Sequence, residues 1–357
     1  GDHVHLRFEN MATGRVGRAT ARYVVGADGA RSLVRRFIDT PMEDLGFHER
    51  WLVVDALLHR DRPDLGPHTV QYCNPARPAT YSPGPGGRRR WEIAVHPQDE
   101  PMTEARAWAL LRDWITPDEA SLERVAVYTF HALVAQDWRR GRLLLAGDAC
   151  HQTPPFMGQG LCAGVRDAAN LYWKLALACR DHPATEALLA SYTTERRPNA
   201  REYVATAVRL GRLINAADSG AALRAALPGA ADDGPARMHS IAPPLGAGLG
   251  LGPLAGRLFG QPRMADGRRL DEALPGGFVL VAEAALPGGE RTRLPPGLAC
   301  VTPTEAPDAA VHLARLGARA TILRPDRHTL GAADTAGELA DLIARALPYL
   351  QPETAPT

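Results

Sequence analysis

Cysteine is scarce in this sequence, and charge of neither sign is in excess. The five cysteines, Cys73, Cys150, Cys162, Cys179 and Cys300, lack the paired spacing of a metal or redox site and are odd in number for disulfides. The 41 basic residues nearly balance the 40 acidic ones, so composition gives no electrostatic case for binding nucleic acid or a membrane surface. A reducing cytoplasm is the simplest location for such a chain.

Long apolar runs and a nucleotide-binding glycine turn are also missing. No apolar stretch approaches the ~18 residues of a membrane-spanning helix, and no signal peptide opens the chain. The residues before Asp28 contain no strand, Gly-x-Gly-x-x-Gly turn and helix for a dinucleotide pyrophosphate. The glycine cluster 246–252 follows Pro243 and Pro244 without a flanking strand and helix, so we interpret it as a loop.

The most informative segment is residues 142–176, RLLLAGDACHQTPPFMGQGLCAGVRDAANLYWKLA. The apolar run Leu143–Leu145 predicts a short strand buried on both faces. Gly147 permits a tight turn as the chain leaves the sheet. Asp148 then presents a carboxylate at the carboxyl end of the strand, where ligands of open α/β sheets bind. A carboxylate at that place suits sugar hydroxyls.

A stiff loop and a glycine-rich helix start follow this turn. Pro154 and Pro155 fix two backbone angles, and residues 158–160 leave N–H groups uncovered at the start of a helix, where anions or electron-rich carbonyl edges are favoured. Apolar residues recur at helical spacing at positions 161, 165, 168, 172, 175 and 179, while Arg166, Asn170 and Lys174 fall on another side. We therefore expect an amphipathic helix docked by its apolar face.

Two motifs carry a family resemblance. Residues 142–176 resemble the second flavin-binding motif of the flavoprotein aromatic monooxygenases related to p-hydroxybenzoate hydroxylase, and residues 23–36, YVVGADGARSLVRR, resemble the Asp-Gly motif of that family. The motifs stand in the right order, about 120 residues apart. The chain is most similar to the 3-(3-hydroxyphenyl)propionate hydroxylase branch. Further similarity extends the resemblance over nearly the whole chain, at residues 51–55, 72–78, 192–197 and 324–327.

The resemblance implies a mixed α/β fold: an incomplete Rossmann-like FAD-binding domain, an inserted substrate-domain β-sheet, a helical region and a small thioredoxin-like C-terminal domain. The expected divisions are 1–45 for the rest of the FAD-binding domain with the Asp-Gly motif, 46–135 for the sheet, 136–215 for the return of the FAD-binding domain, 216–267 for a linker and 268–350 for the thioredoxin-like domain, which lacks Cys-x-x-Cys. We expect roughly the first hundred or more residues of the ancestral enzyme to be missing, and this chain alone to retain FAD poorly.

Local patterns add element predictions to this outline. A hairpin is expected from residues 3–8 and 18–23, and a helix break at Pro198. Trp91, Ile93 and Val95 alternate with residues 92, 94 and 96, which predicts a strand of a half-buried sheet. Strands are also expected at 278–282 and 320–323, with a last helix whose apolar face includes residues 339–347.

The resemblance implies FAD as cofactor and NADH or NADPH as co-substrate. The cofactor contacts it implies are Asp28, Gly29, Arg31, Gly147, Asp148, Pro154, Gly158, Gln159, Gly160 and Cys162. Cys162 stands where relatives commonly carry asparagine. From the sheet, Gln71, Tyr72 and the basic run 88–90 are candidates to approach a phenolic or carboxylate substrate. His151 is interpreted as a packing and hydrogen-bonding residue, and no catalytic residue or metal ligand is assigned.

The implied activity is hydroxylation of a phenolic or other aromatic compound. NAD(P)H reduces FAD, the reduced flavin captures O2 as a C4a-hydroperoxide, and the distal oxygen passes to the ring. The partners are then a small aromatic substrate and O2, and a homodimer is compatible with the pattern. Two alternatives remain open: a non-catalytic remnant or partner-dependent module, and a reductase or dehydrogenase of the same fold.

Overall fold

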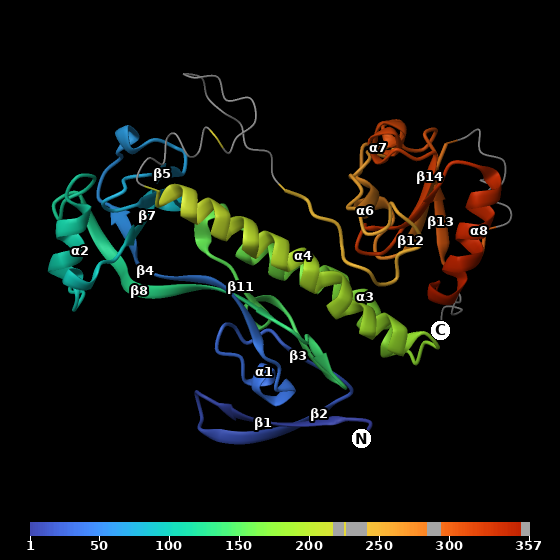
Figure 1. The fold of residues 1–357 in the computed structure, drawn as a ribbon, viewed down its shortest axis with the longest axis horizontal. Coiled ribbons are helices and arrows are strands. Elements are labelled where there is room, and N and C mark those ends of the chain that lie inside the picture. Colours follow the sequence, from blue (N-terminus) through green and yellow to red (C-terminus); the bar gives the residue numbers. More distant parts are fainter. Residues whose placement is uncertain (217–224, 226–240, 284–293, 351–357) are drawn as a thin grey trace.

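The computed structural model describes residues 1–216, 225, 241–283 and 294–350. Figure 1 shows a six-stranded sheet at one end of the molecule and a C-terminal α/β unit at the other, with α3 (Gly160–Ala178) and α4 (Thr185–Ile214) between them. The fold is mixed α/β, as the sequence predicts. Among the described helices, none has the length and apolar character needed to span a membrane.

The N-terminal part forms a hairpin and a small sheet. The predicted hairpin is confirmed as β1 (Val4–Asn10) paired antiparallel with β2 (Arg15–Ala21). The next strand, β3 (Val24–Gly26), leads through the Asp-Gly motif into α1 (Leu33–Ile38). A three-stranded sheet has the order β3-β10-β9, in which β10 is Leu143–Leu145 and β9 is Arg139–Arg140. Because β3 and β10 are parallel, both motifs leave the same edge of this sheet.

The six-stranded sheet is antiparallel, with the order β11-β8-β4-β7-β6-β5. Its strands are β4 (Met42–Leu58), β5 (Val70–Tyr72), β6 (Ala79–Pro83), β7 (Arg88–Ala94), β8 (Ala120–Ala135) and β11 (His151–Gln152). The predicted alternation in β7 is confirmed, because Trp91 and Ile93 are fully buried in a core that also includes Ala107 and Leu111 of α2 (Glu104–Leu111). The sheet begins at Met42, slightly before the expected division at residue 46.

The expected helix break at Pro198 is wrong, since α4 continues through this proline. Proline removes the amide that would donate to the carbonyl of Thr194. A glycine-rich loop covers the helix at this point: the Gly246 amide donates to the carbonyl of Glu195 over 2.8 Å, and a Cβ on Gly246 would lie 2.2 Å from the Thr194 carbonyl oxygen. Loop packing thus supports the helix around the proline, and the glycine cluster is a loop, as predicted.

The expectation that α3 docks by its apolar face is also wrong. Leu161, Val165 and Tyr172 are exposed, whereas Asn170 and Lys174 are completely buried. The reason is a buried polar network that pairs this helix with α4 and the C-terminal unit. Periodicity correctly predicts that α3 has two different faces, but the face that packs inward combines Asn170 and Lys174 with apolar residues outside the predicted stripe, such as Leu171, Trp173 and Leu177.

The C-terminal unit contains a four-stranded sheet with the order β13-β12-β14-β15, in which β12 and β13 are parallel and β14 and β15 form an antiparallel hairpin. Its elements are α6 (Leu270–Ala273), β12 (Phe278–Ala282), β13 (Leu298–Val301), α7 (Ala309–Leu316), β14 (Ala320–Leu323), β15 (Thr329–Ala333) and α8 (Ala336–Ala346). The two predicted strands are confirmed. Much of the expected linker, at 217–224 and 226–240, lies outside the described residues.

A buried ionic cluster joins this unit to α3 and α4. Glu195 of α4 accepts hydrogen bonds from Lys174 of α3 at 2.7 Å and from Arg324, after β14, at 2.8 and 2.9 Å. Arg324 also pairs with Asp326, and Asn170 donates to both carboxylates at 3.0 Å. Two cations therefore meet two anions, so the cluster is electrically balanced although water does not reach it.

Candidate flavin site

The two predicted motifs lie side by side at the carboxyl ends of β3 and β10. Arg35 of α1 joins them, because its guanidinium donates to the carbonyl of Ala149 at 2.8 Å and to that of Ala30 at 2.7 Å. The side chain of Gln152 also donates to Ala30 at 3.3 Å. The sequence order of the motifs thus corresponds to one continuous edge in space, where ligands of α/β sheets bind.

The Gly-Asp turn leaves one carboxylate exposed at this edge. Gly147 has φ = 64°, a left-handed conformation that favours glycine. Asp148, the next residue, is exposed, and within the described part of the chain no side chain or amide is seen to bond to its carboxylate. An unengaged carboxylate after a parallel strand can accept hydrogen bonds from ligand hydroxyls.

A second carboxylate holds the turn from behind. Asp167 of α3 is completely buried and accepts a hydrogen bond from the Gly147 amide at 2.9 Å. Its other partners are His151, whose Nε2 lies 2.7 Å away, and Arg196 of α4, whose Nε donates over 2.9 Å. Burial alone would raise the pKa of Asp167, but His151 and Arg196 outweigh it and hold the pKa below its usual range. The carboxylate therefore fixes the turn as an anion.

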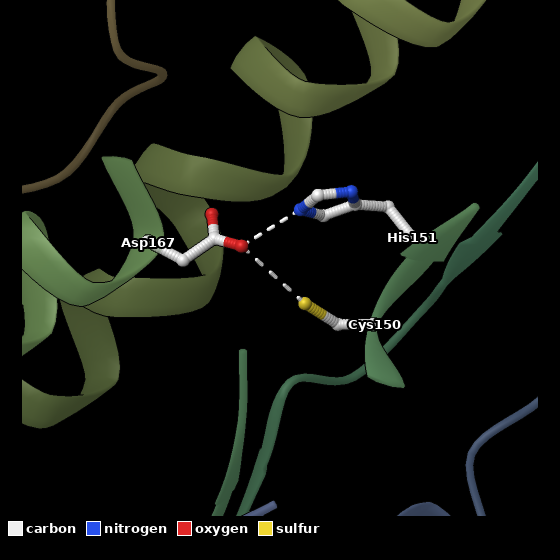
Figure 2. A group of neighbouring side chains, drawn as sticks. All are labelled: Cys150, His151 and Asp167. Atoms are coloured by element: carbon white, nitrogen blue, oxygen red, sulfur yellow. Dashed lines mark hydrogen bonds and ion pairs between the residues drawn. The ribbon is translucent and has the colours of Figure 1, made fainter. Parts of the chain in front are cut away.

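Cys150, His151 and Asp167 form a group that invites a metal interpretation. Figure 2 shows the Cys150 sulfur and the His151 ring both directed at the same oxygen of Asp167, and one potential ligand atom of each residue lies within 4.8 Å of the others. However, Asp167 is already paired with the guanidinium of Arg196, which would repel a metal cation. Burial also raises the pKa of the Cys150 thiol well above its ordinary value, so the thiolate ligand is disfavoured. The group is better explained as support for the turn.

Close packing of α3 on the turn depends on a glycine. A Cβ placed on Gly164 would lie 3.2 Å from the Cα of Gly147, closer than nearly all real contacts of that kind. The turn and the helix therefore approach each other backbone to backbone. This contact positions the first turns of α3 relative to Asp148.

The start of α3 is open. Gly158 has φ = 60°, and the chain enters the helix without a side-chain cap. The side-chain carbonyl oxygen of Gln159 is instead held by Arg166 at 3.3 Å, and Arg166 itself stacks on the Tyr203 ring. The N–H groups of the first helical turn carry partial positive charge and have no intrahelical acceptor. An electron-rich ligand edge would satisfy them.

A cavity of about 830 Å³ lies between this loop and the polar face of the six-stranded sheet. It is lined by Thr69, Gln71, Thr80, Ser82, Arg90, Glu92, Thr153, Pro154, Pro155, Phe156, Met157, Gly158, Gln159, Gly160 and Leu161. The hydroxyl oxygen of Thr153 is buried and makes no hydrogen bond within the described structure. A buried hydroxyl without a partner at a cavity wall is typical of a ligand site.

The structure divides the predicted cofactor residues into groups. Pro154, Gly158, Gln159 and Gly160 line the cavity. Gly147 and Asp148 lie at the adjoining sheet edge, as do the exposed Arg31 and the partly buried Gly29, while Cys162 is exposed in the first turn of α3. These positions remain predictions of flavin contacts.

The carboxylate of Asp28 is already engaged within the chain. Its carboxylate accepts hydrogen bonds from the Ser32 hydroxyl at 2.5 Å and from the amides of Leu33 and Val34 at 2.7 and 3.2 Å. Burial raises its pKa, but these bonds outweigh burial and lower it overall. The carboxylate is thus engaged in capping α1, and we leave Asp28 out of the proposed flavin contacts.

The two substrate candidates on β5 face opposite sides of the sheet. Gln71 lines the cavity. Tyr72 lies on the other face, with its ring centroid 5.3 Å from that of Trp114 in the core. Since neighbouring residues of a strand point to opposite faces, the side chains of Gln71 and Tyr72 cannot both line the cavity. We keep only Gln71 as a substrate candidate.

Sequence reasoning missed the residues that support and line the site, namely Asp167, Arg196, Thr153 and Glu92. Asp167 was available as an acidic residue inside a glycine-rich helix start, but its partner Arg196 lies on another helix. Glu92 was placed on the wet face of its strand by the alternation of β7. That pattern could not show that the wet face forms a cavity.

The sequence of this chain matches a family of FAD-binding proteins and individual aromatic hydroxylases. Residues 1–207 match the family model "FAD binding domain". A protein of Rhodococcus jostii (strain RHA1) named "Probable NADH-specific resorcinol 4-hydroxylase" is 36% identical over 388 aligned residues, which cover 100% of this chain and 72% of that relative. A 3-(3-hydroxy-phenyl)propionate/3-hydroxycinnamic acid hydroxylase of Paraburkholderia xenovorans (strain LB400) is 42% identical over 194 residues, 53% of this chain and 30% of that relative.

A solved structure shares the fold. The flavin-dependent monooxygenase PieE, crystallised with FAD and substrate, superposes with a TM-score of 0.75 at 20% identity, covering 98% of this chain and 74% of that chain. At this identity the likeness establishes the architecture alone. The arrangement of sheet, long helices and C-terminal unit is therefore one that a flavin-dependent enzyme uses.

Proposed function

This chain belongs to the FAD binding domain family of the flavoprotein aromatic monooxygenases, and from that premise we propose that it takes part in hydroxylating a phenolic ring with FAD, NADH and O2. The observation that carries the proposal is the cavity between the open start of α3 and the polar face of the six-stranded sheet. A flavin ring and a small aromatic ring can meet there. NADH is proposed from the name of the Rhodococcus relative.

The residues of this edge fit a flavin. The uncapped first turn of α3 offers N–H groups to the electron-rich edge of the ring. A Cβ added to Gly158 or Gly160 would have no neighbouring atom within 4 Å, so there is open space for a planar group to approach their backbone. The exposed carboxylate of Asp148 would accept hydrogen bonds from ribityl hydroxyls. The unpartnered Thr153 hydroxyl is a further donor.

Bound FAD, once reduced by NADH, supplies the O2-activating chemistry. The described residues of the chain contribute orientation and water exclusion. Pro154 and Pro155 stiffen the loop that lines the cavity, and Phe156 in the same lining packs against Trp51 and Phe47 with ring centroids 5.6 Å apart. An apolar wall beside a polar ligand limits the entry of water, which protects a reactive intermediate from breakdown by water.

The names of the two relatives share a hydroxylated benzene ring, and we propose a substrate of that class here. A cytoplasmic location and a homodimer also remain proposals. If the chain were a reductase or dehydrogenase of the same fold, it would consume NADH without incorporating oxygen, and a non-catalytic module would do neither. Oxidation of NADH stimulated by resorcinol, together with mass-spectrometric detection of O2-derived oxygen in the product, tests the proposal against both alternatives.

Asp148→Asn is expected to weaken flavin binding about tenfold or more, because it removes the charge from an acceptor of ligand hydroxyls. The free energy of unfolding should stay nearly unchanged, since the side chain is exposed and makes no bond within the described chain. Titration of flavin fluorescence against protein, beside urea unfolding of both forms, gives the two quantities. Equal flavin affinity in the variant and the parent would remove Asp148 from the site.

A further inference from the structure

The polar face of the six-stranded sheet carries a row of three side chains across the cavity. Gln71 on β5 stands opposite Thr80 on β6, and Thr80 stands opposite Glu92 on β7. The Thr80 hydroxyl donates to Oε1 of Gln71 at 2.7 Å, and the Gln71 amide donates to the Ala79 carbonyl at 3.0 Å. Two members of the row therefore hold each other in fixed orientations. Glu92 is the third.

The neighbouring row is electrically neutralised. Arg90 donates to both oxygens of Asp55, at 2.6 and 3.0 Å, and Arg124 lies 3.8 Å from the same carboxylate. Outside the cavity, Arg88 is engaged by Glu123 at 2.8 and 3.0 Å. Arg90 is the cation among the described residues that line the cavity, and its charge is already matched. The described wall thus offers no unpaired cation to an anionic ligand.

Glu92 differs from the other carboxylates of this sheet face. It lines the cavity and is half-buried, and its carboxylate makes no hydrogen bond or ion pair with the described residues. Burial raises its pKa; Arg90 opposes this effect and Asp55 adds to it. An acid that is partly removed from water and left without a partner is costly unless a ligand uses it.

We propose that Glu92 receives the hydroxyl group of an uncharged phenol in this cavity, and that the cavity selects such phenols over phenols bearing a carboxylate. The proposal rests on the proposed function and defines its substrate class. The phenolic O–H donates to a carboxylate oxygen of Glu92. The step assigned to Glu92 is a proton transfer: the phenolic O–H bond breaks, a new O–H bond forms on the carboxylate, and the electron pair of the broken bond stays on the phenolic oxygen. Delocalisation of that pair makes the ring more nucleophilic.

This role of Glu92 explains two features of the described cavity wall: the carboxylate without a partner and the lack of an unpaired cation. An ionised Glu92 repels a second carboxylate, and the matched Arg90 does not compensate for that repulsion. A raised pKa also makes Glu92 a better proton acceptor than an ordinary surface glutamate, because base strength increases with pKa. Of the substrates named for the two relatives, resorcinol satisfies these conditions, whereas 3-(3-hydroxyphenyl)propionate places a second negative charge in the cavity.

Binding provides the first test. Resorcinol and 3-(3-hydroxyphenyl)propionate are titrated in separate experiments into the 357-residue chain in the presence of FAD, with ligand-observed NMR as the readout. We expect resorcinol to bind more tightly, and Glu92→Gln to weaken resorcinol about tenfold or more while leaving the propionate unchanged or improved. Glu123→Gln is the matched control, since it makes the same chemical change outside the cavity. Resorcinol affinity equal in Glu92→Gln and the parent would overturn the proposal, as would a parent that prefers the propionate.

The pH dependence of turnover provides the second test. Because Glu92 accepts a proton only when ionised, kcat/KM for resorcinol should rise with pH through the pKa of this group, and Glu92→Gln should lose that rise together with about a hundredfold in kcat. Thermal unfolding shows whether the variant is folded. If the folded variant keeps the pH dependence of kcat/KM seen in the parent, Glu92 is not the proton acceptor. A parent chain that holds FAD, whether alone or at saturating FAD, but oxidises no NADH with either phenol counts instead against the proposed function.

Discussion

Replacing Glu195 by glutamine is expected to lower the free energy of unfolding by about 3–5 kcal/mol, because the change leaves Lys174 and Arg324 as buried cations without their shared partner. Asp326 neutralises only one of them. Urea unfolding followed by circular dichroism gives the free energy directly. Glu186 offers a matched control on the same helix: it pairs with Arg139 but is mostly exposed, so Glu186→Gln should cost less than about 1 kcal/mol. A loss of unfolding free energy of similar size in both variants would show that burial of the cluster does not increase its contribution to stability.

The same cluster predicts how stability depends on pH. Although burial opposes ionisation, Arg324 and Lys174 lower the pKa of Glu195 to about 2, against an ordinary value of 4.5. Its stabilising contribution is therefore complete above about pH 4.5 and is lost as the pH falls towards 2. Burial lowers the pKa of Lys174 to about 8, so the unfolded chain binds the extra proton between pH 8 and 10.5, and stability from this group rises over that range.

The elements predicted from local patterns are those whose stabilising partners are near in sequence or follow a simple period. The N-terminal hairpin, the alternation of β7 and the strands Phe278–Ala282 and Ala320–Leu323 are of this kind. Their residues alternate or form apolar runs that a sheet buries without any distant charged partner. The Gly-Asp turn belongs here too, because glycine at a left-handed position is a local requirement.

The errors arose where distant charged groups decide the packing. Hydrophobic periodicity assigns the apolar stripe of α3 to the core, but Glu195 pairs with Lys174, and both Glu195 and Asp326 accept hydrogen bonds from Asn170. These two carboxylates come from another helix and from the C-terminal unit. No property of the helix itself indicates that these partners exist. The apolar stripe at Leu161 and Val165 is consequently left uncovered by the described residues.

The candidate site was predictable in its loop and less so in its walls. The proline and glycine residues from Pro154 to Gly160 line the cavity, and their contact with a flavin stays a prediction. The motif alone could not separate Asp28, whose carboxylate caps a helix, from Asp148, whose carboxylate has no partner among the described residues, because both follow a parallel strand in a similar local pattern. To choose between Gln71 and Tyr72, one must know which face of β5 borders the cavity. The structure shows this, but the sequence does not.

Asp167→Asn is expected to reduce both stability and flavin binding, in contrast to Asp148→Asn, which should affect flavin binding alone. The charge of Asp167 balances Arg196 in a place that water does not reach, so its loss should cost about 3–5 kcal/mol of unfolding free energy. An asparagine amide would also present N–H groups to Arg196 or to the Gly147 amide, and the turn that carries Asp148 would lose its anchor.

Both effects of Asp167→Asn can be measured on one preparation, by urea unfolding and by titration of flavin fluorescence under conditions in which the variant remains folded. Flavin affinity should fall at least as far as in Asp148→Asn, because displacement of the turn moves the exposed carboxylate and the start of α3 together through the Gly147 and Gly164 contact. A variant that loses stability but keeps full flavin affinity would mean that the turn holds its shape without Asp167. In that case the carboxylate supports the core, and the geometry of the flavin edge is set by the glycine contact and Arg35.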